Sequence, residues 1–211
     1  MNTPSYFICA PTATGKSSLA IRLAKKIGGK IVNADSMQVY SNLEILTARP
    51  SKTDHEKVEH LLYGYINGSE RYNVAKWIRD ISKIINKSKA PLIIVGGTGM
   101  YIKSLIEGIV DIPTINENFK KESEFLLQKI GLENFIKKIM NFDSESLKNI
   151  SFNDNSRVRR IWEVYNSTGI SLSDWKKKKN KKYINDFNYK IFLFNPLRDK
   201  IYQNVNIRFK E

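Results

Sequence analysis

The segment with the clearest chemistry is the run Ala10-Pro-Thr-Ala-Thr-Gly-Lys-Ser17. It matches the pattern G-x-x-x-x-G-K-[ST], except that Ala10 replaces the first glycine, and it lies between an expected strand and an expected helix, as the pattern requires. Backbone N–H groups of such a loop bind phosphate oxygens, Lys16 adds a cation, and the Ser17 hydroxyl can ligate Mg²⁺. The alternative is an ordinary strand–turn–helix. The predicted phosphate-binding residues are Ala10, Pro11, Thr12, Ala13, Thr14, Gly15, Lys16 and Ser17.

Two further segments follow expected strands and carry polar groups. Asp35 lies just after the second strand, and Thr98 lies within the turn Gly96-Gly-Thr-Gly99 after a later one. Ligands bind beyond the carboxyl ends of parallel strands, so both segments are expected at the same sheet edge as the phosphate loop. Asp35 could bind Mg²⁺ through water or accept a proton, or it could simply cap a turn. The glycine turn could admit a ligand or be a plain strand-to-helix turn.

The elements that must position these groups follow from hydrophobic patterning. Short apolar runs predict buried strands, and a helical period predicts helices. Because strands alternate with helices, we expect an α/β fold: a P-loop NTPase-like parallel sheet flanked by helices, with a mostly helical insert. The expected strands are 6–10, 30–33, 92–95 and 189–194, with 61–66 interrupted by Gly64, and the expected helices are 15–27, 74–86 and one from Pro196 through Phe209.

The chain changes character after Gly108, where residues 119–140 and 143–169 are charged, amphipathic and helical in pattern. We therefore predict a phosphate-loop core at 1–110, a mostly helical insert at 111–183, and a return strand and helix at 184–211. The run Lys176–Lys182 is expected to be a solvated basic segment.

Composition narrows the class of partner. The 211 residues carry 35 Lys and Arg against 21 Asp and Glu, a formal charge of +14, which favours a polyanion such as nucleic acid, although a lysine-rich genome would give the same balance. No apolar run approaches the roughly 20 residues that span a bilayer, and no secretory signal is recognised. The single cysteine, Cys9, excludes an intramolecular disulfide and favours a cytoplasmic setting.

Several motifs occur in a fixed order, and together they resemble the tRNA dimethylallyltransferase family over nearly the whole chain. They are the phosphate loop, Ala34-Asp-Ser-Met-Gln-Val-Tyr40, Thr47-Ala-Arg-Pro50, Gly96-Gly-Thr-Gly-Met-Tyr101, and Asn153-Asp154 with Arg157 and Arg160. The chain departs from the family at Ala10, at Leu46 where the family has glycine, and at Glu59, which replaces the first of two histidines. Family chains also continue beyond the equivalent of Glu211, so we expect a short copy.

The resemblance implies transfer of a dimethylallyl group from dimethylallyl diphosphate to the exocyclic N6 of adenosine 37, beside the anticodon of tRNA, with Mg²⁺ required. The loop amides, Lys16 and Mg²⁺ on Ser17 would stabilise the departing diphosphate. Asp35 would accept the proton of the adenine amine, and Thr98 would position the adenine or the diphosphate. Arg208 falls near a family arginine that acts at the diphosphate.

The adenine must leave the anticodon loop to react, so basic contacts to the RNA backbone are expected. A solvated helix face is the alternative for the arginines. Besides tRNA, the resemblance implies dimethylallyl diphosphate as a partner. It implies no contact with a membrane, and we expect the protein to be a monomer. The tRNA contacts implied by the resemblance are Asp35, Ser36, Met37, Gln38, Thr98, Lys120, Ser156, Arg157, Val158, Arg159 and Arg160.

Two other functions are open on the sequence alone. A P-loop kinase for a nucleoside or another small molecule would use Lys16, Ser17 and Asp35 on ATP, although the basic charge and the Ala34–Tyr40 block argue against it. A non-catalytic remnant that binds tRNA would fit the early end at Glu211.

Overall fold

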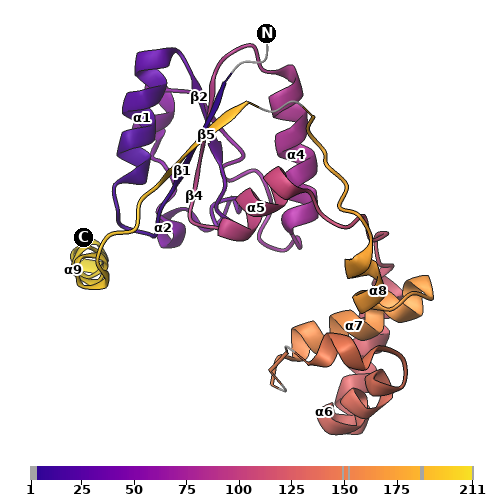
Figure 1. Cartoon of the computed structure of the whole chain (residues 1–211). Coiled ribbons are helices and arrows are strands. Elements are labelled where there is room, and N and C mark those ends of the chain that lie inside the picture. The colour runs from indigo at the N-terminus through magenta and orange to yellow at the C-terminus, as the bar shows by residue number, and fades with distance from the viewer. Residues whose placement is uncertain (1–3, 149, 152, 186–187, 211) are drawn as a thin grey trace. The chain divides into compact units, whose positions relative to one another are not determined.

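The computed structural model describes residues 4–148, 150–151, 153–185 and 188–210. They divide into two compact units (Figure 1). The first, which we call the sheet unit, contains the chain up to Ile109 and from Lys182 onward, and the second, the helical unit, is Val110–Lys181. The insert expected from the sequence spans 111–183, so its two boundaries lie within two residues of those of the helical unit. Each unit has its own hydrophobic core.

The sheet unit is built on five strands in the order β3-β2-β4-β1-β5, and all neighbouring pairs are parallel. This confirms the predicted α/β fold. The strand expected at 61–66 is much shorter, because Leu62 and Gly64 take positive φ angles of 61° and 57° that turn the chain away from the sheet. The strands are β1 (Ser5–Cys9), β2 (Lys30–Asn33), β3 (His60–Leu61), β4 (Leu92–Gly96) and β5 (Tyr189–Leu193).

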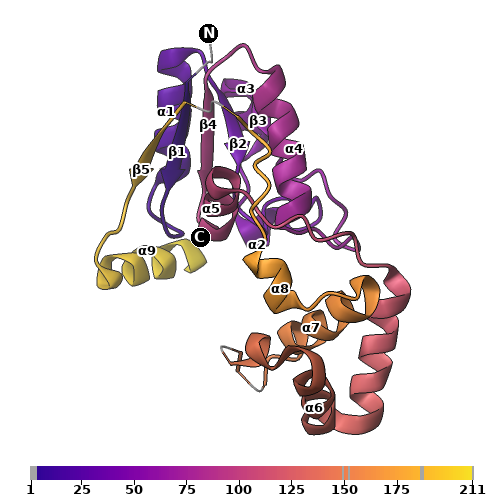
Figure 2. The same ribbon diagram turned by 45° about the vertical axis from the view of Figure 1, so that its right-hand side comes forward.

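Helices cover both faces of the sheet because buried residues alternate along its strands. Phe7 and Ile94 point to a cluster that includes Trp77 of α4 (Val74–Lys87) and Tyr101 of α5 (Gly99–Glu107). Their neighbours, such as Ile8, point to the opposite cluster, which includes Ala20 of α1 (Lys16–Ile27). Figure 2 shows α1 and α4 on opposite sides of the strands. The phosphate loop is thus held between a buried strand and a packed helix.

The remaining helices of the sheet unit are short or exposed. The sequence pattern missed α2 and α3, since elements this short carry too few residues for a helical period, and it also missed α5, although the glycine turn before it was noted. The remaining helices of the sheet unit are α2 (Glu44–Thr47), α3 (Lys52–Lys57) and α9 (Arg198–Lys210), of which the sequence pattern predicted α9.

The helical unit contains α6 (Glu117–Leu147), α7 (Asn155–Thr168) and α8 (Leu172–Lys177). Its core includes Phe135, Ile139 and Ile161. The long helix is interrupted at Gly131 and Asp143, whose backbone angles are not helical. The Asp143 carboxylate accepts hydrogen bonds from the Ser146 hydroxyl and from the backbone N–H of Ser173, so it fixes α8 against the end of α6. Among the described helices of both units, none is long and apolar enough to cross a membrane.

A close backbone contact brings the ends of β2 and β4 together. A Cβ atom on Gly96 would lie 2.1 Å from the carbonyl oxygen of Ala34, so only glycine fits there. Immediately beyond this contact, the backbone N–H of Ser36 donates to the Thr98 hydroxyl at 3.1 Å. The loops that carry Asp35 and Thr98 are therefore joined at one edge of the sheet.

Candidate functional site

The phosphate loop turns back on itself before α1. Ala13 and Gly15 have φ angles of 58° and 80°, and Gly15 is the residue from which α1 begins. The Thr14 hydroxyl and the Lys16 ammonium group both donate to the carbonyl oxygen of Pro11, at 2.9 and 3.2 Å. These contacts fold the loop over the N-terminus of α1, where backbone N–H groups favour an anion.

Lys16 lies in a partly desolvated position next to charges from two other elements. Burial lowers the pKa of Lys16 below its usual range, and this is the largest effect. The carboxylate of Asp35 raises the pKa of Lys16, while the guanidinium of Arg208 lowers it. The structure thus brings together three predicted site residues, from the loop, from the end of β2 and from α9.

Helix α9 contacts the phosphate loop directly. The Arg208 guanidinium donates to the Thr12 hydroxyl at 3.2 Å, and the Asn204 side-chain amide donates to the carbonyl oxygen of Ala13 at 2.9 Å. Asn204 was missed by sequence reasoning. The available signal was its position one helical turn before Arg208, which places both side chains on the same helix face.

Asp35 closes its own turn with one of its two carboxylate oxygens. Oδ1 accepts hydrogen bonds from the backbone N–H groups of Met37 at 2.9 Å and Gln38 at 3.4 Å. Within the described part of the chain, no hydrogen bond to Oδ2 is found. Oδ1 therefore caps the turn, as one alternative expected, whereas Oδ2 is available to another group.

The side chains next to Asp35 that were predicted to contact RNA differ in their exposure and in their hydrogen bonds within the protein. The Met37 side chain is exposed. The Gln38 amide nitrogen donates to the carbonyl oxygens of Thr47 and Ala48, at 2.9 and 3.2 Å, so its donors serve the protein. Ser36 and Thr98 bond to each other, with the Thr98 hydroxyl 3.5 Å from the Ser36 hydroxyl.

Two tyrosines border Asp35 and were missed as site residues. Tyr101 is 2% exposed and stacks on Trp77 with ring centroids 4.7 Å apart. Burial, with contributions from Tyr40 and Asp35, raises the pKa of Tyr101 to about 12. Burial and Asp35 also raise the pKa of Tyr63. Both phenols therefore stay neutral near the carboxylate. Tyr101 ends the motif Gly96–Tyr101, but the motif alone assigned it no role in the site.

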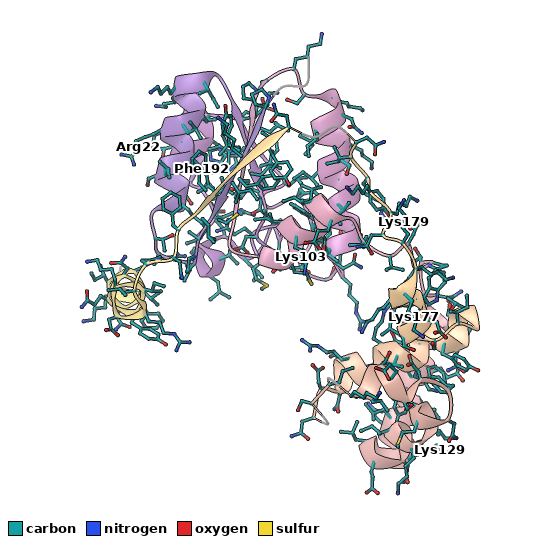
Figure 3. All side chains as sticks on the ribbon, in the orientation of Figure 1. Arg22, Lys103, Lys129, Lys177, Lys179 and Phe192 are labelled. Atoms are coloured by element: carbon teal, nitrogen blue, oxygen red, sulfur yellow. The ribbon has the colours of Figure 1, made fainter. Side chains whose placement is uncertain are left out.

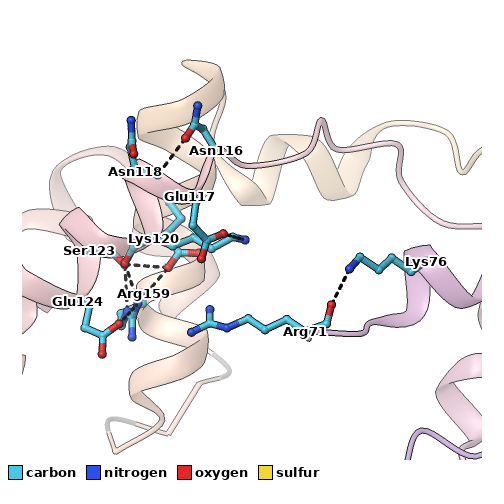
Figure 4. A network of polar contacts seen from close by, with 10 residues as sticks. Arg71, Lys76, Asn116, Glu117, Asn118, Lys120, Ser123, Glu124 and Arg159 are labelled. Carbon is cyan, nitrogen blue, oxygen red and sulfur yellow. Dashed lines mark hydrogen bonds and ion pairs between the residues drawn. The ribbon is translucent and has the colours of Figure 1, made fainter. Parts of the chain in front are cut away.

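Arg159, one of the predicted cations of the helical unit, is held by contacts within the fold. Its guanidinium donates to the Ser123 hydroxyl at 3.0 Å and to the carbonyl oxygen of Lys120 at 2.8 Å (Figure 4). It also lies near the carboxylates of Glu124 at 3.3 Å and Glu163 at 3.7 Å. The Ser123 hydroxyl donates to Glu163 at 2.8 Å. Arg159 therefore joins α6 to α7.

The other predicted residues of this unit have distinct surroundings. Arg157 is exposed and its guanidinium lies 3.1 Å from Asp154. Burial lowers the pKa of Arg160, while Glu163 opposes that shift. Lys120 pairs with Glu117 at 2.6 Å, and Ser156 is exposed.

For Val158 the structure corrects the prediction of an RNA contact. Its side chain is 1% exposed and packs in the core of the helical unit, where RNA cannot reach it.

The lysine run is less uniform than a solvated segment. Lys177 pairs with Asp174 at 2.7 Å, Lys178 lies over the ring of Trp175 at 3.7 Å, and Lys181 pairs with Asp111 at 2.7 Å. Basic side chains on both units nevertheless point to solvent, including the labelled Arg22, Lys103, Lys129 and Lys177 (Figure 3).

The geometry defines an α/β protein of the P-loop class, with a phosphate loop, a cation and a carboxylate gathered at the carboxyl ends of parallel strands. The model of the IPP transferase family matches residues 38–211. The chain belongs to the IPP transferase family.

Curated relatives extend the match across the phosphate loop. The chain is 40% identical over 205 residues to the tRNA dimethylallyltransferase of Pelagibacter ubique (strain HTCC1062), covering 95% of this chain and 65% of that protein. It is 41% identical over 202 residues to the tRNA dimethylallyltransferase of Bartonella henselae, covering 95% and 70%. The chain thus spans about two thirds of the length of these relatives.

Solved structures support the fold. A eukaryotic dimethylallyltransferase described as acting on tRNA superposes with a TM-score of 0.80 at 24% identity, over 99% of this chain and 52% of that one. The tRNA isopentenylpyrophosphate transferase of Bacillus halodurans superposes with a TM-score of 0.60 at 25% identity, over 100% and 65%.

The Arg159 network yields a prediction about stability. We expect Arg159→Ala to destabilise the helical unit by about 2 kcal/mol, because it removes hydrogen bonds of a charged donor and the ion pair between Arg159 and Glu163. Hydrogen exchange should become faster in α6 and α7 and stay unchanged in β1 and β4. Arg157→Ala is the matched control, since Arg157 is exposed, and should change neither. Equal effects of the two substitutions would contradict a structural role for Arg159.

Proposed function

We propose that this protein transfers a dimethylallyl group from dimethylallyl diphosphate to N6 of adenosine 37 in tRNA, giving N6-(dimethylallyl)adenosine. Membership of the IPP transferase family supports the reaction class. The observation that carries the proposal is the gathering of Lys16, Arg208 and Asp35 at one sheet edge, where the charges alter the pKa of Lys16. Cations for a leaving diphosphate and a carboxylate for a departing proton are the two requirements of this transfer.

The phosphate loop would stabilise the leaving group. As the bond between the prenyl carbon and the diphosphate oxygen breaks, negative charge grows on the diphosphate. The backbone N–H groups at the start of α1 and the Lys16 ammonium group lie where such charge would be bound. Arg208 on Thr12 adds a second cation to the same loop. Partial burial of Lys16 strengthens its interaction with an anion, because less water screens it.

The residues present fit a Mg²⁺ ion that is held jointly with the substrate. Ser17 is exposed in the first turn of α1, and in the described ranges its hydroxyl makes no hydrogen bond. The described residues contain no group of three or more His, Cys, Asp or Glu that could hold a metal alone. Mg²⁺ commonly combines one or two protein ligands with phosphate oxygens and water, so Ser17 would hold it with the diphosphate. When bound, the ion would neutralise charge on the leaving group.

Asp35 would act on the acceptor. The adenine amine is a weak nucleophile because its lone pair is delocalised into the ring, so it must lose a proton as the new C–N bond forms. Oδ1 of Asp35 is occupied by Met37 and Gln38, which leaves Oδ2 for that proton. Thr98, bonded to Ser36, would place the adenine beside Asp35.

The helical unit would supply contacts to the RNA backbone. Arg157 is exposed and Arg160 is partly buried, and both lie near the start of α7. Guanidinium groups bind phosphates bidentately and stack on unpaired bases, which suits an anticodon loop with an extruded adenine. We further propose that the protein acts as a monomer in the cytoplasm, where its tRNA substrate is found.

A transfer assay tests the proposed function. Labelled dimethylallyl diphosphate is incubated with unmodified tRNA, Mg²⁺ and the protein, and label in the RNA is measured. We expect transfer by the wild type and a loss of roughly 10²–10³-fold in Lys16→Ala, because a cation on the leaving group is removed. Lys103→Ala, an exposed lysine on α5, is the matched control and should leave the rate unchanged. Phosphate release from ATP without label in the RNA would favour a kinase, and tRNA binding without transfer would favour a remnant.

The base is tested separately from binding. Asp35→Asn keeps the shape of the side chain and an oxygen that can close the turn, but it removes the charged proton acceptor. We expect the single-turnover rate to fall by about 10²–10⁴-fold with a small change in tRNA affinity. Loss of tRNA binding with an unchanged single-turnover rate would make Asp35 a recognition residue only.

The RNA contact of the helical unit is tested by salt dependence. We expect Arg157→Ala and Arg160→Ala each to weaken tRNA binding and to flatten the log–log slope against salt by about 0.7 for each RNA phosphate that the variant no longer neutralises. Affinity for dimethylallyl diphosphate should not change. Lys129→Ala, an exposed cation on α6 outside the predicted set, serves as the control. Wild-type slopes in both arginine variants would contradict this role of α7.

A further inference from the structure

We propose that Asn33 is a positioning residue that sets the orientation of Asp35, and therefore the direction in which its free carboxylate oxygen points. The inference rests on the proposed function only where it concerns the rate of transfer. Its structural part concerns the hydrogen bonds of the turn and stands independently of any reaction.

Asn33 is the last residue of β2 and is fully buried, at 0% exposure. Its side-chain amide nitrogen donates to the carbonyl oxygen of Asp35 at 2.9 Å and to that of Leu62 at 3.0 Å. Its Oδ1 accepts from the backbone N–H of Asp35 at 2.8 Å. One side chain thus holds both backbone polar groups of Asp35, and both of its own donors are used.

This arrangement fixes more than a turn. With its N–H and C=O both held, the Asp35 backbone has little freedom to rotate, so the Cα–Cβ bond leaves the sheet edge in one direction. Oδ1 then bonds to Met37 and Gln38, which fixes the rotation of the carboxylate as well. The remaining oxygen, Oδ2, is held in one orientation. A general base needs such placement, because proton transfer requires a short, aligned contact.

Asn33 can hold Asp35 because Asn33 itself is immobile. Its carbonyl oxygen accepts a hydrogen bond from the indole N–H of Trp77 at 2.8 Å, and Trp77 is fully buried. The second acceptor of its amide, Leu62, lies in the left-handed conformation that ends β3. The orientation of Asp35 therefore depends on the positions of α4 and of the end of β3, which both pack in the core of the sheet unit. A hydroxyl at position 33 is too short to reach both carbonyls.

The test is a double-mutant cycle between Asn33→Ser and Asp35→Asn, measured as single-turnover transfer. If Asn33 acts through Asp35, Asn33→Ser should slow transfer about 100-fold alone and cause no further loss in the Asp35→Asn background. Affinity for dimethylallyl diphosphate should stay unchanged, because the phosphate loop is held by other contacts. Ile81→Val makes a small cavity in the same core cluster and should leave the rate unchanged. The same loss from Asn33→Ser in both backgrounds would overturn the proposal.

Hydrogen exchange provides a readout that needs no reaction. In Asn33→Ser the backbone amides of Asp35 and Met37 should lose protection, while the amide of Ile94 in β4 keeps it. In the wild type, the Asn33 side-chain amide protons should exchange far more slowly than those of an exposed asparagine. Fast exchange of these protons would overturn the proposal even if Asn33→Ser failed to fold. Slow exchange in a wild type that transfers no dimethylallyl group would retain the positioning role and refute the proposed function.

Discussion

The partly buried charge of Lys16 is the feature on which the rest of the site depends. Desolvation disfavours an ammonium ion, and here Arg208 adds repulsion, whereas Asp35 and the Pro11 carbonyl compensate only in part. A cation in this state interacts strongly with an incoming anion, because little water must be displaced. The loop must hold its shape for this to work, and the bond from Asn204 to Ala13, which has a positive φ angle, secures it.

The same edge of the sheet also depends on a steric constraint. Because Gly96 lies against the Ala34 carbonyl, the loops after β2 and β4 approach closely enough for Ser36 to bond to Thr98. A side chain at position 96 would separate these loops and move Asp35 away from Lys16. Gly96 thus helps to hold in one place the cation that we propose for the leaving group and the carboxylate that we propose for the proton.

Local patterns made much of this predictable. The phosphate loop, the buried strands and the helical segment each have a sequence signal that spans adjacent residues. The partners of Arg159 on α6 lie far away in the sequence, so nothing local distinguished it from Arg157. The same holds for Val158, whose burial depends on how α7 packs, and for Asn33, whose role depends on a bond to Leu62. The sequence therefore predicted which segments meet at the sheet edge, but it could not predict the partners of every side chain.

The two separately packed units carry charges of two different kinds for the proposed reaction. In the sheet unit, a few charges are partly buried and held by specific hydrogen bonds, so small displacements change their effect on the reacting atoms. In the helical unit, Arg159 joins α6 and α7, whereas Arg157 on the same helix is exposed. In the proposed reaction, charges of the first kind would act on the rate of bond making, and charges of the second kind would act on how tightly RNA is held. Because the cores are separate, a substitution in one unit is not expected to alter the packing that supports the other.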